Sequence, residues 1–174
     1  LRRQRQMCIR DSVWADDPGP CTQARIVRFL VPFGYGDDPR TRAGMDWLLA
    51  AQRDGGMWDC GRPGRPGCLR ATLDVLRAAI LDAEAASHTI VASGAEALCA
   101  LLMMPRMHRY HAGHDWEVLE YPCFDYCLTA ALQALGCLGY TTADPRVAAA
   151  LDYLLSRQAP DGTWPLDHRR DRLP

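Results

Sequence analysis

Apolar side chains recur in this chain with the period of an α-helix. Two stretches show this most clearly, because they place an apolar side chain or a threonine at positions i, i+4, i+7 and i+8. These residues are Thr41, Met45, Leu48 and Leu49 in the first stretch, and Val147, Leu151, Leu154 and Leu155 in the second. Residues with this spacing share one face of a helix, so each stretch predicts a helix with one buried stripe.

Both predicted helices have clear boundaries. Each begins with an Asp-Pro pair, Asp38-Pro39 in the first and Asp144-Pro145 in the second. An aspartate is a good N-cap, and a proline at the first helical position costs no hydrogen bond because that N–H has no partner inside the helix. Glycines at 55–56 and at 162 follow the two helices and predict their ends.

Four further helices are predicted before and between these two. Their apolar stripes have the same helical spacing, and a break near Ser87-His88 separates the second from the third. The stripes are Ile26, Phe29, Leu30 and Phe33; Leu69, Leu73, Leu76 and Ile80; Val91, Ala95, Leu98 and Leu102; and Leu128, Leu132 and Leu135. No segment alternates with a period of two. We therefore expect an all-α fold of six helices in three antiparallel pairs, without a sheet.

The chain also repeats itself. Residues 38–58 match residues 144–164 at a constant offset of 106 positions, which corresponds to two repeats of ~53 residues. The matched pairs are Gln52 and Gln158, Gly56 and Gly162, and Trp58 and Trp164. The middle repeat lacks this pattern, because Pro105 and His111 stand where the glutamine and the tryptophan are expected. A repeat of this length predicts stacked helix pairs, each of which covers the face of its neighbour.

The residues that repeat also carry a resemblance. Arg42, Gly44, Trp47-Leu48, Gln52, Gly56 and Trp58 have the order and spacing of the glutamine–tryptophan repeat of squalene and hopene cyclases, and residues 146–164 carry a second copy. Over roughly Pro20–Asp167 the chain resembles bacterial prenyltransferase and squalene oxidase repeat proteins. The resemblance implies an α/α toroid, of which this chain supplies about three helix pairs. It also implies that the repeated residues have a structural role.

The physical chemistry of these residues agrees with such a role. A buried glutamine amide needs several hydrogen-bond partners, and the last carbonyls of a helix need donors. A tryptophan buries a large apolar area and keeps one N–H as an anchor. We therefore expect Gln52 and Gln158 to connect the end of one helix to the next repeat, with Trp58 and Trp164 packed against them.

The first twelve residues differ in character from the rest. Leu1–Ser12 is basic, has no helical period and resembles the in-frame translation of a transposase sequencing adapter. We expect it to be non-native and disordered, and the alternative is a disordered basic N-terminus. The domain is then 13–174. We expect this domain to be incomplete, because six helices do not close a toroid and leave the faces of the end repeats bare.

Composition argues against several classes of function. The 174 residues are 48% hydrophobic and 24% charged, which is typical of one globular domain. A net charge of −1 gives no electrostatic reason to expect nucleic acid as a partner. No apolar run approaches the ~18–20 residues of a transmembrane helix. The eight cysteines form no CxxC pair, which favours reduced thiols and a cytoplasmic protein.

The resemblance implies two kinds of chemistry. Hopene-type cyclases use an Asp-x-Asp-Asp acid, and the nearest segments here are Asp16-Asp17 and Asp37-Asp38, which lack the pattern. Protein prenyltransferases bind zinc through Asp, Cys and His, and Asp125-Tyr126-Cys127 is similar to their Asp-x-Cys at the start of an inner helix. Asp125 and Cys127 are thus candidate zinc ligands without a third partner. The alternative is no cofactor, with Asp125 as a helix N-terminal acid.

Three more groups of residues stay open between a site and a purely structural role. They are Cys21, Cys68 and Cys123 at the starts of inner helices; His108, His111 and His114 in one connection; and Arg62, Arg65 and Arg70. Helix starts lower the pKa of a thiol, histidines three apart suit a metal, and arginine forks suit a diphosphate. Small residues at tight helix starts and exposed polar loops explain the same groups without a ligand.

Two functions follow from these observations. The first is a prenyltransferase or terpene-cyclase-like toroid that acts on or binds an isoprenoid-type apolar substrate. The alternative is a non-catalytic α/α-toroid repeat module that binds a ligand or a protein. The absence of the acid motif favours the second, and the sequence leaves open whether the chain is an enzyme.

Overall fold

The computed structural model describes residues 19–60, 67–104, 116–121 and 126–169. Helices make up most of the regular structure of these residues, which confirms the predicted all-α fold. The helices are α3 (Pro20–Leu30), the 3-10 helix η1 (Val31–Phe33), α4 (Pro39–Ala50), α5 (Leu69–Ala79), α6 (Ala83–Ala86), α7 (Thr89–Ala100), α8 (Leu128–Cys137) and α9 (Pro145–Ser156).

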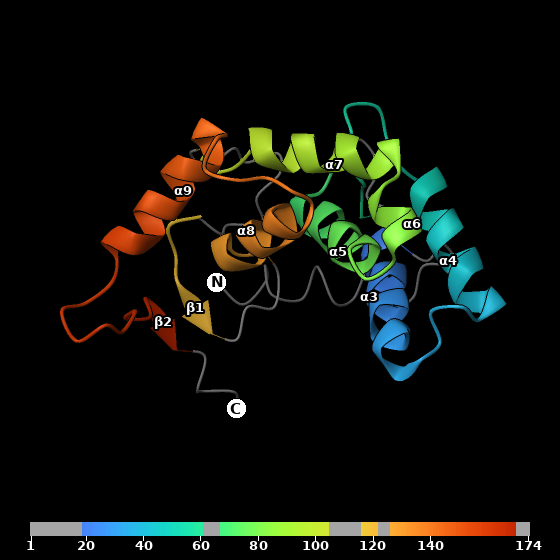
Figure 1. Ribbon diagram of the computed structural model, residues 1–174, viewed down its shortest axis with the longest axis horizontal. Coiled ribbons are helices and arrows are strands. Elements are labelled where there is room, and N and C mark those ends of the chain that lie inside the picture. The colour runs from blue at the N-terminus through green and yellow to red at the C-terminus, as the bar shows by residue number, and fades with distance from the viewer. Residues whose placement is uncertain (1–18, 61–66, 105–115, 122–125, 170–174) are drawn as a thin grey trace, which may run out of the picture.

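The helices form two layers that follow an arc. In the inner layer α3 packs against α5, and α5 packs against α8. Each inner helix carries an outer helix, with α4 on α3, α7 on α5 and α9 on α8. Figure 1 shows α4, α7 and α9 as the outer row around α3, α5 and α8. The described part of the chain therefore consists of three stacked helix pairs.

The core lies between the two layers and is centred on α5. Nine of the eleven residues of α5 are buried, because α3, α7 and α8 all pack against this helix. By contrast, α9 buries only Val147 and Ala150, and its Leu155 is 60% exposed. Apolar side chains of the helical stripe are thus buried in the middle of the arc and partly exposed at its end.

The aspartate caps have the predicted geometry in both copies. The Asp38 carboxylate accepts a hydrogen bond from the backbone N–H of Arg40 at 2.9 Å, and Asp144 accepts the equivalent bond from Arg146 at 2.9 Å. Pro39 and Pro145 are the first residues of α4 and α9. The middle outer helix uses another acceptor, because the Nδ1 atom of His88 accepts from the N–H of Ile90 at 3.2 Å.

Three features differ from the expectation of six helices and no sheet, and the first is the 3-10 helix η1 directly after α3. The break near Ser87-His88 contains the short helix α6, whose first N–H groups are capped by Asp82. In addition, β1 (Glu120–Tyr121) and β2 (His168–Arg169) form a parallel ladder of two residues. The Asp167 N–H donates to the Leu119 carbonyl at 2.8 Å, which aligns the two segments. Pairs this short leave no periodic pattern in the sequence.

The apolar stripe of α3 lies on the outside of the first pair. Phe29 and Phe33 are each 66% exposed, and their ring centroids are 5.0 Å apart. The core face of α3 consists of Pro20, Ala24 and Val27 instead. Since α3 is the last inner helix of the arc at this end, none of the described helices covers its outer face (Figure 1).

Candidate binding site at the open end of the arc

The first repeated motif connects three helices. The Gln52 amide nitrogen donates to the Gly56 carbonyl at 2.8 Å, and to the Ile90 carbonyl in the first turn of α7 at 2.8 Å. Gly56 has a φ of +82°, and a Cβ atom at this residue would lie 2.6 Å from the Ser93 carbonyl oxygen. Only glycine satisfies both conditions, since it tolerates positive φ and brings no side chain toward α7.

Trp58 completes this first clasp, as we call Gln52, Gly56 and Trp58 together. Its side chain is fully buried, and the indole N–H donates to the Leu48 carbonyl near the end of α4 at 2.6 Å. The backbone N–H of Trp58 donates to the Thr72 hydroxyl of α5 at 3.1 Å. Thus one residue satisfies a carbonyl at the end of α4 and holds this helix against the next pair.

The second clasp, Gln158, Gly162 and Trp164, repeats these local bonds. The Gln158 amide donates to the Gly162 carbonyl at 2.8 Å, and the Trp164 indole donates to the Leu154 carbonyl at 2.7 Å. Gly162 has a φ of +85°, close to that of Gly56. The two clasps therefore have the same internal geometry at equivalent positions of α4 and α9.

The clasps differ in what covers them. Trp58 lies between α5 and α7, whereas Trp164 is 40% exposed. Among the described residues, no helix stands beside the second clasp as α5 and α7 stand beside the first. The Gln158 amide has one described acceptor, where the Gln52 amide has two. The second clasp is thus complete within its own repeat and open toward a neighbour.

An apolar cavity of about 360 Å³ lies beside Trp164. We call it the end cavity, and its lining consists of Val118, Leu119, Cys127, Leu128, Thr129, Leu154, Trp164 and Leu166. The Cys127 sulfur and the Thr129 hydroxyl oxygen, which lie 3.3 Å apart, are the only side-chain polar groups in this lining apart from the indole N–H. A volume of this size is in the range of small-molecule sites, and the walls suit an apolar occupant.

The middle repeat contains a tryptophan that sequence reasoning missed. Trp116 is buried, and its indole N–H donates to the Leu101 carbonyl at the end of α7 at 2.8 Å. Its ring meets Tyr126 edge to face at 5.3 Å between centroids. Each outer helix therefore gives a C-terminal carbonyl to an indole. The sequence pattern did not reveal this bond, because Trp116 follows its acceptor Leu101 by fifteen residues, whereas Trp58 follows Leu48 by ten.

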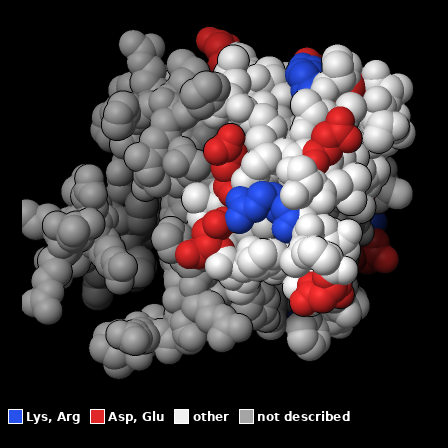
Figure 2. Space-filling view, turned by 90° about the vertical axis from the view of Figure 1, so that its left-hand side faces the viewer, with Lys and Arg blue, Asp and Glu red and all other residues white. Residues whose placement is uncertain are grey.

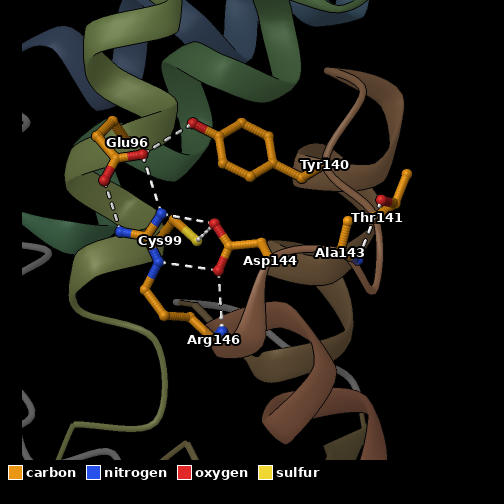
Figure 3. A network of polar contacts seen from close by, with 7 residues as sticks. All are labelled: Glu96, Cys99, Tyr140, Thr141, Ala143, Asp144 and Arg146. Carbon is orange, nitrogen blue, oxygen red and sulfur yellow. Dashed lines mark hydrogen bonds and ion pairs between the residues drawn. The ribbon is translucent and has the colours of Figure 1, made fainter.

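A polar network joins the outer helices α7 and α9 (Figure 3). The Arg146 guanidinium contacts Glu96 of α7 at 2.5 Å and its own cap Asp144 at 2.6 Å. Hydrogen bonds from Arg146 lower the pKa of Asp144 to about 2. Burial, together with the Glu96 charge, raises the pKa of Tyr140, which also donates to Glu96, to about 12. The network thus fastens α9 to α7 with charges that persist at neutral pH.

The candidate zinc ligands receive no support from the described residues. Cys127 is the N-cap residue of α8, and Asp125 lies outside the described residues. Within the described ranges, no group of three or more His, Cys, Asp or Glu side chains is placed to bind a metal. A protein zinc site needs at least three protein ligands, and since Asp125 lies outside the described residues, the zinc site stays a prediction.

The other thiols at helix starts are not activated. Burial raises the pKa of Cys21 in the first turn of α3. The pKa of Cys68, the N-cap residue of α5, is raised by a hydrogen bond with Cys60 and by burial. Neither thiol has the lowered pKa that a helix start favours, because burial acts on Cys21, and the hydrogen bond with Cys60 together with burial acts on Cys68. Residues Cys123, His108, His111, His114, Arg62 and Arg65 lie outside the described residues.

The charged surface on the α9 side of the molecule is mixed. In the described part of this face, Figure 2 shows basic groups with acidic groups beside them, among mostly uncharged residues. An ion pair joins Arg157 and Asp167 at 2.7 Å. In the part of the chain that the structure describes, no helix is long and apolar enough to span a membrane.

Fold and site define a helical repeat protein with one clasp covered and one open. Comparisons of the sequence with protein families and with curated proteins, and of the structure with solved structures, give no match. The resemblance to squalene-cyclase and prenyltransferase repeats therefore stays a prediction.

Proposed function

We propose that this chain is an α/α repeat module that binds a further pair of antiparallel helices at its open end. The observation that carries the proposal is the comparison of the two clasps. Their internal hydrogen bonds are the same, but Trp58 is buried by α5 and α7 while Trp164 is 40% exposed beside an apolar cavity. Surfaces between stacked repeats are apolar because each repeat relies on its neighbour to cover it.

The first clasp defines what such a partner must present. Its inner helix needs a hydroxyl to accept the Trp164 backbone N–H, as Thr72 accepts that of Trp58. Its outer helix needs a glycine at the indole edge, as Gly94 in α7, and a first-turn carbonyl for the Gln158 amide, as that of Ile90. The partner is therefore a helix pair of the same repeat type.

Covering Trp164 supplies a useful part of the binding free energy. Its exposed 40% corresponds to about 100 Å² of a tryptophan surface of ~250 Å². At ~25 cal/mol per Å² this contributes about 2.5 kcal/mol. Leu154 and Leu166, which line the end cavity, add further apolar area.

The proposal can be tested by giving the chain a partner of known structure. Residues 69–104 contain α5 to α7, and a second copy added directly after Pro174 places these helices as far from Trp164 as the original ones are from Trp58. We expect Trp164 to become buried. Acrylamide quenching of fluorescence, compared with a Trp164→Phe version of the same chain, isolates the signal of this residue.

The matched control changes one residue of the added copy. A Gly94→Leu substitution in that copy, with the original Gly94 intact, puts a side chain where the Trp164 ring edge should lie. We expect this version to leave Trp164 as accessible as in the unextended chain. If the unmodified copy also leaves Trp164 accessible, the open end is not a repeat-binding surface and the proposal fails.

The end cavity supports a second candidate, an isoprenoid-type apolar ligand bound by a prenyltransferase or terpene-cyclase relative. Its volume of about 360 Å³, apolar lining and indole wall suit such a molecule. Farnesol is a suitable probe, because on this proposal it quenches Trp164 fluorescence in the unextended chain and is excluded by the added helix pair. The zinc proposal predicts one bound zinc that is lost with Asp125→Ala or Cys127→Ala.

A further inference from the structure

The α3–α4 pair at the other end of the arc matches the α5–α7 pair that covers the first clasp. The inner helices α3 and α5 have eleven residues each, and the outer helices α4 and α7 have twelve each. A Cβ atom at Gly44 of α4 would lie 3.0 Å from the Val27 side chain of α3, and one at Gly94 of α7 would lie 3.3 Å from the Leu76 side chain of α5. Both glycines stand six residues after their N-cap residues, and both apolar residues stand eight after theirs. The two pairs are therefore equivalent position by position.

The place of an indole is open at the α3–α4 pair. A Cβ atom at Gly94 would lie 2.5 Å from the Trp58 ring. Outside α4 itself, Val27 is the only described residue within 4 Å of a Cβ atom at Gly44. The outer helix of this pair therefore has a glycine and free space at the point where the second clasp needs them.

The other two contacts of a clasp also have acceptors on this pair. Gln23 of α3 stands at the position of Thr72 and offers an amide oxygen in place of the hydroxyl. The first-turn carbonyl of Arg40 stands at the position of the Ile90 carbonyl, which accepts from Gln52. Every group that the first clasp uses on its neighbour thus has a counterpart on α3 and α4.

Apolar surface on α3 fits the same equivalence. Ile26 and Phe29 are 48% and 66% exposed. They stand at the positions of Val75 and Ala78, which are fully buried in α5. The α3–α4 pair therefore exposes apolar residues at positions that are covered in the middle of the arc.

The outer helices supply an electrostatic contact as well (Figure 3). Arg146 and the Tyr140 hydroxyl both donate to Glu96 of the preceding outer helix α7. Glu96 is the eighth residue of α7, and Asp152 is the eighth residue of α9. Asp152 is exposed and makes no ion pair or side-chain hydrogen bond with the described residues. The last outer helix thus presents a carboxylate toward the place of a following helix.

The first outer helix presents the matching donors. Arg40 binds the carboxylate of its own N-cap residue as Arg146 does, but its side chain is 84% exposed, against 35% for Arg146. Tyr35 follows a glycine of positive φ, as Tyr140 does, and is 49% exposed. Among the described residues, no carboxylate of another helix reaches Arg40 or Tyr35.

We propose that the partner of the open end is a second copy of this chain, whose α3–α4 pair docks on the second clasp. This inference rests on the function proposed above and names the partner. In this arrangement Asp152 of one molecule meets Arg40 of the next, and Trp164 lies against Gly44. The Gln158 amide gains the Arg40 carbonyl as its second acceptor. Shape, hydrogen bonds and charge all select the same register.

An exchange of charge between two variants tests this register. Arg40→Glu brings two carboxylates together at the contact, and Asp152→Arg brings two guanidinium groups together. Each variant alone should self-associate at least tenfold more weakly than the parent chain, because like charges oppose each other there. An equimolar mixture should associate as strongly as the parent, since every contact between unlike molecules again joins a carboxylate to a guanidinium. Sedimentation velocity measures association, and acrylamide quenching should show Trp164 becoming less accessible in parallel.

Two matched controls make the same charge changes elsewhere on α4. Arg42 pairs with Asp37 and lies two residues after Arg40, on a different face of the helix. Asp46 has the place in α4 that Asp152 has in α9, but the outer helix that follows it is α7 of the same molecule. Arg42→Glu and Asp46→Arg should each associate as the parent does.

The chain extended by a second copy of α5 to α7 separates this proposal from the one on which it rests. We expect the extended chain to bury Trp164 and to lose self-association, because the added helices occupy the second clasp. If it buries Trp164 but the parent chain stays monomeric, or if mixing the two charge variants restores nothing, the second copy is not the partner and the function proposed above stands. If the extended chain leaves Trp164 accessible, both proposals fail.

Discussion

At the scale of single residues, Gly94 decides how closely the second helix pair approaches the first. A Cβ atom at residue 94 would lie 2.5 Å from the Cζ3 atom of Trp58 and 3.3 Å from the Leu76 side chain. Real Cβ atoms do not make contacts of 2.5 Å, so the indole would have to move. The indole cannot move far without losing its hydrogen bond to the Leu48 carbonyl. A residue with no side chain thus fixes the spacing of the repeats.

The Gly94→Ala substitution should therefore destabilise the fold. Overpacking of a dense core costs about 1–3 kcal/mol, which exceeds the gain of up to ~1 kcal/mol from the better helix propensity of alanine. Urea unfolding followed by circular dichroism measures the change. Gly136→Ala is the matched control, because a Cβ atom at this exposed glycine of α8 meets nothing within 4 Å. Equal effects at the two glycines would show that contact with Trp58 is not the cause.

Regular spacing located the repeated residues at the helix ends, but it did not show that the second clasp lacks the neighbour we expected Gln158 to reach. The two clasps and both aspartate caps stand at an offset of 106 residues, so the sequence alone placed them on equivalent helix ends. Trp116 makes the same bond to the end of α7, but a longer connection separates it from its helix.

At the scale of helices, the outer row is joined by charge as well as by apolar contact. Asp144 caps α9 and also receives the guanidinium of Arg146, which in turn reaches Glu96 of α7 (Figure 3). In the first copy, Asp38 caps α4 and receives Arg40 in the same way. One ionised carboxylate therefore supports both the start of its own helix and, at α9, the link to the neighbouring one.

This arrangement predicts a loss of stability in acid. The pKa of Asp144 is about 2 in the folded chain and near 3.9 in an unfolded one, so its stabilising effect is complete above the unfolded value and disappears as the pH falls through the folded value. Asp144→Asn keeps a capping oxygen but removes the charge. We expect the parent chain to be more stable than this variant at pH 7, with a difference that shrinks between about pH 4 and pH 2. Urea titrations across this range measure it, and a difference independent of pH would contradict the assignment.

The elements themselves were predictable to different degrees. The six long helices follow from apolar stripes and from start signals such as Asp38-Pro39, and all six occur. The ladder of β1 and β2 and the single turn of α6 are too short to produce a period, so only the folded chain reveals them. The stripe of α3 was visible in the sequence, but whether a neighbour covers it is a property of the whole arc.

At the scale of the whole molecule, the arc leaves an apolar face at each end. Phe29 of α3 and Phe33 of η1 form one face, and Trp164 and Leu166 beside the end cavity form the other. The two faces are different surfaces, so contact between them joins one molecule to the next in a head-to-tail manner. Such contacts build rings or open chains rather than simple twofold dimers. Patches of this kind are uncommon on monomeric proteins because they favour association.

We therefore predict that the full chain self-associates as its concentration rises. We also predict that substitutions on one apolar face weaken this association without destabilising the fold. Phe29→Glu combined with Phe33→Glu places charges on a face that is already two-thirds exposed, so the unfolding transition should change little. The association constant should fall at least tenfold, or about 1.4 kcal/mol, because carboxylates would have to be desolvated at the contact. Sedimentation velocity over a concentration series provides the measurement.

Leu81→Glu is the control, since this exposed leucine follows α5 in the middle of the arc. A parent chain that stays monomeric at every concentration would show that neither apolar face drives self-association. If Leu81→Glu weakened association as much as the double variant, the added negative charge rather than the α3 face would govern association.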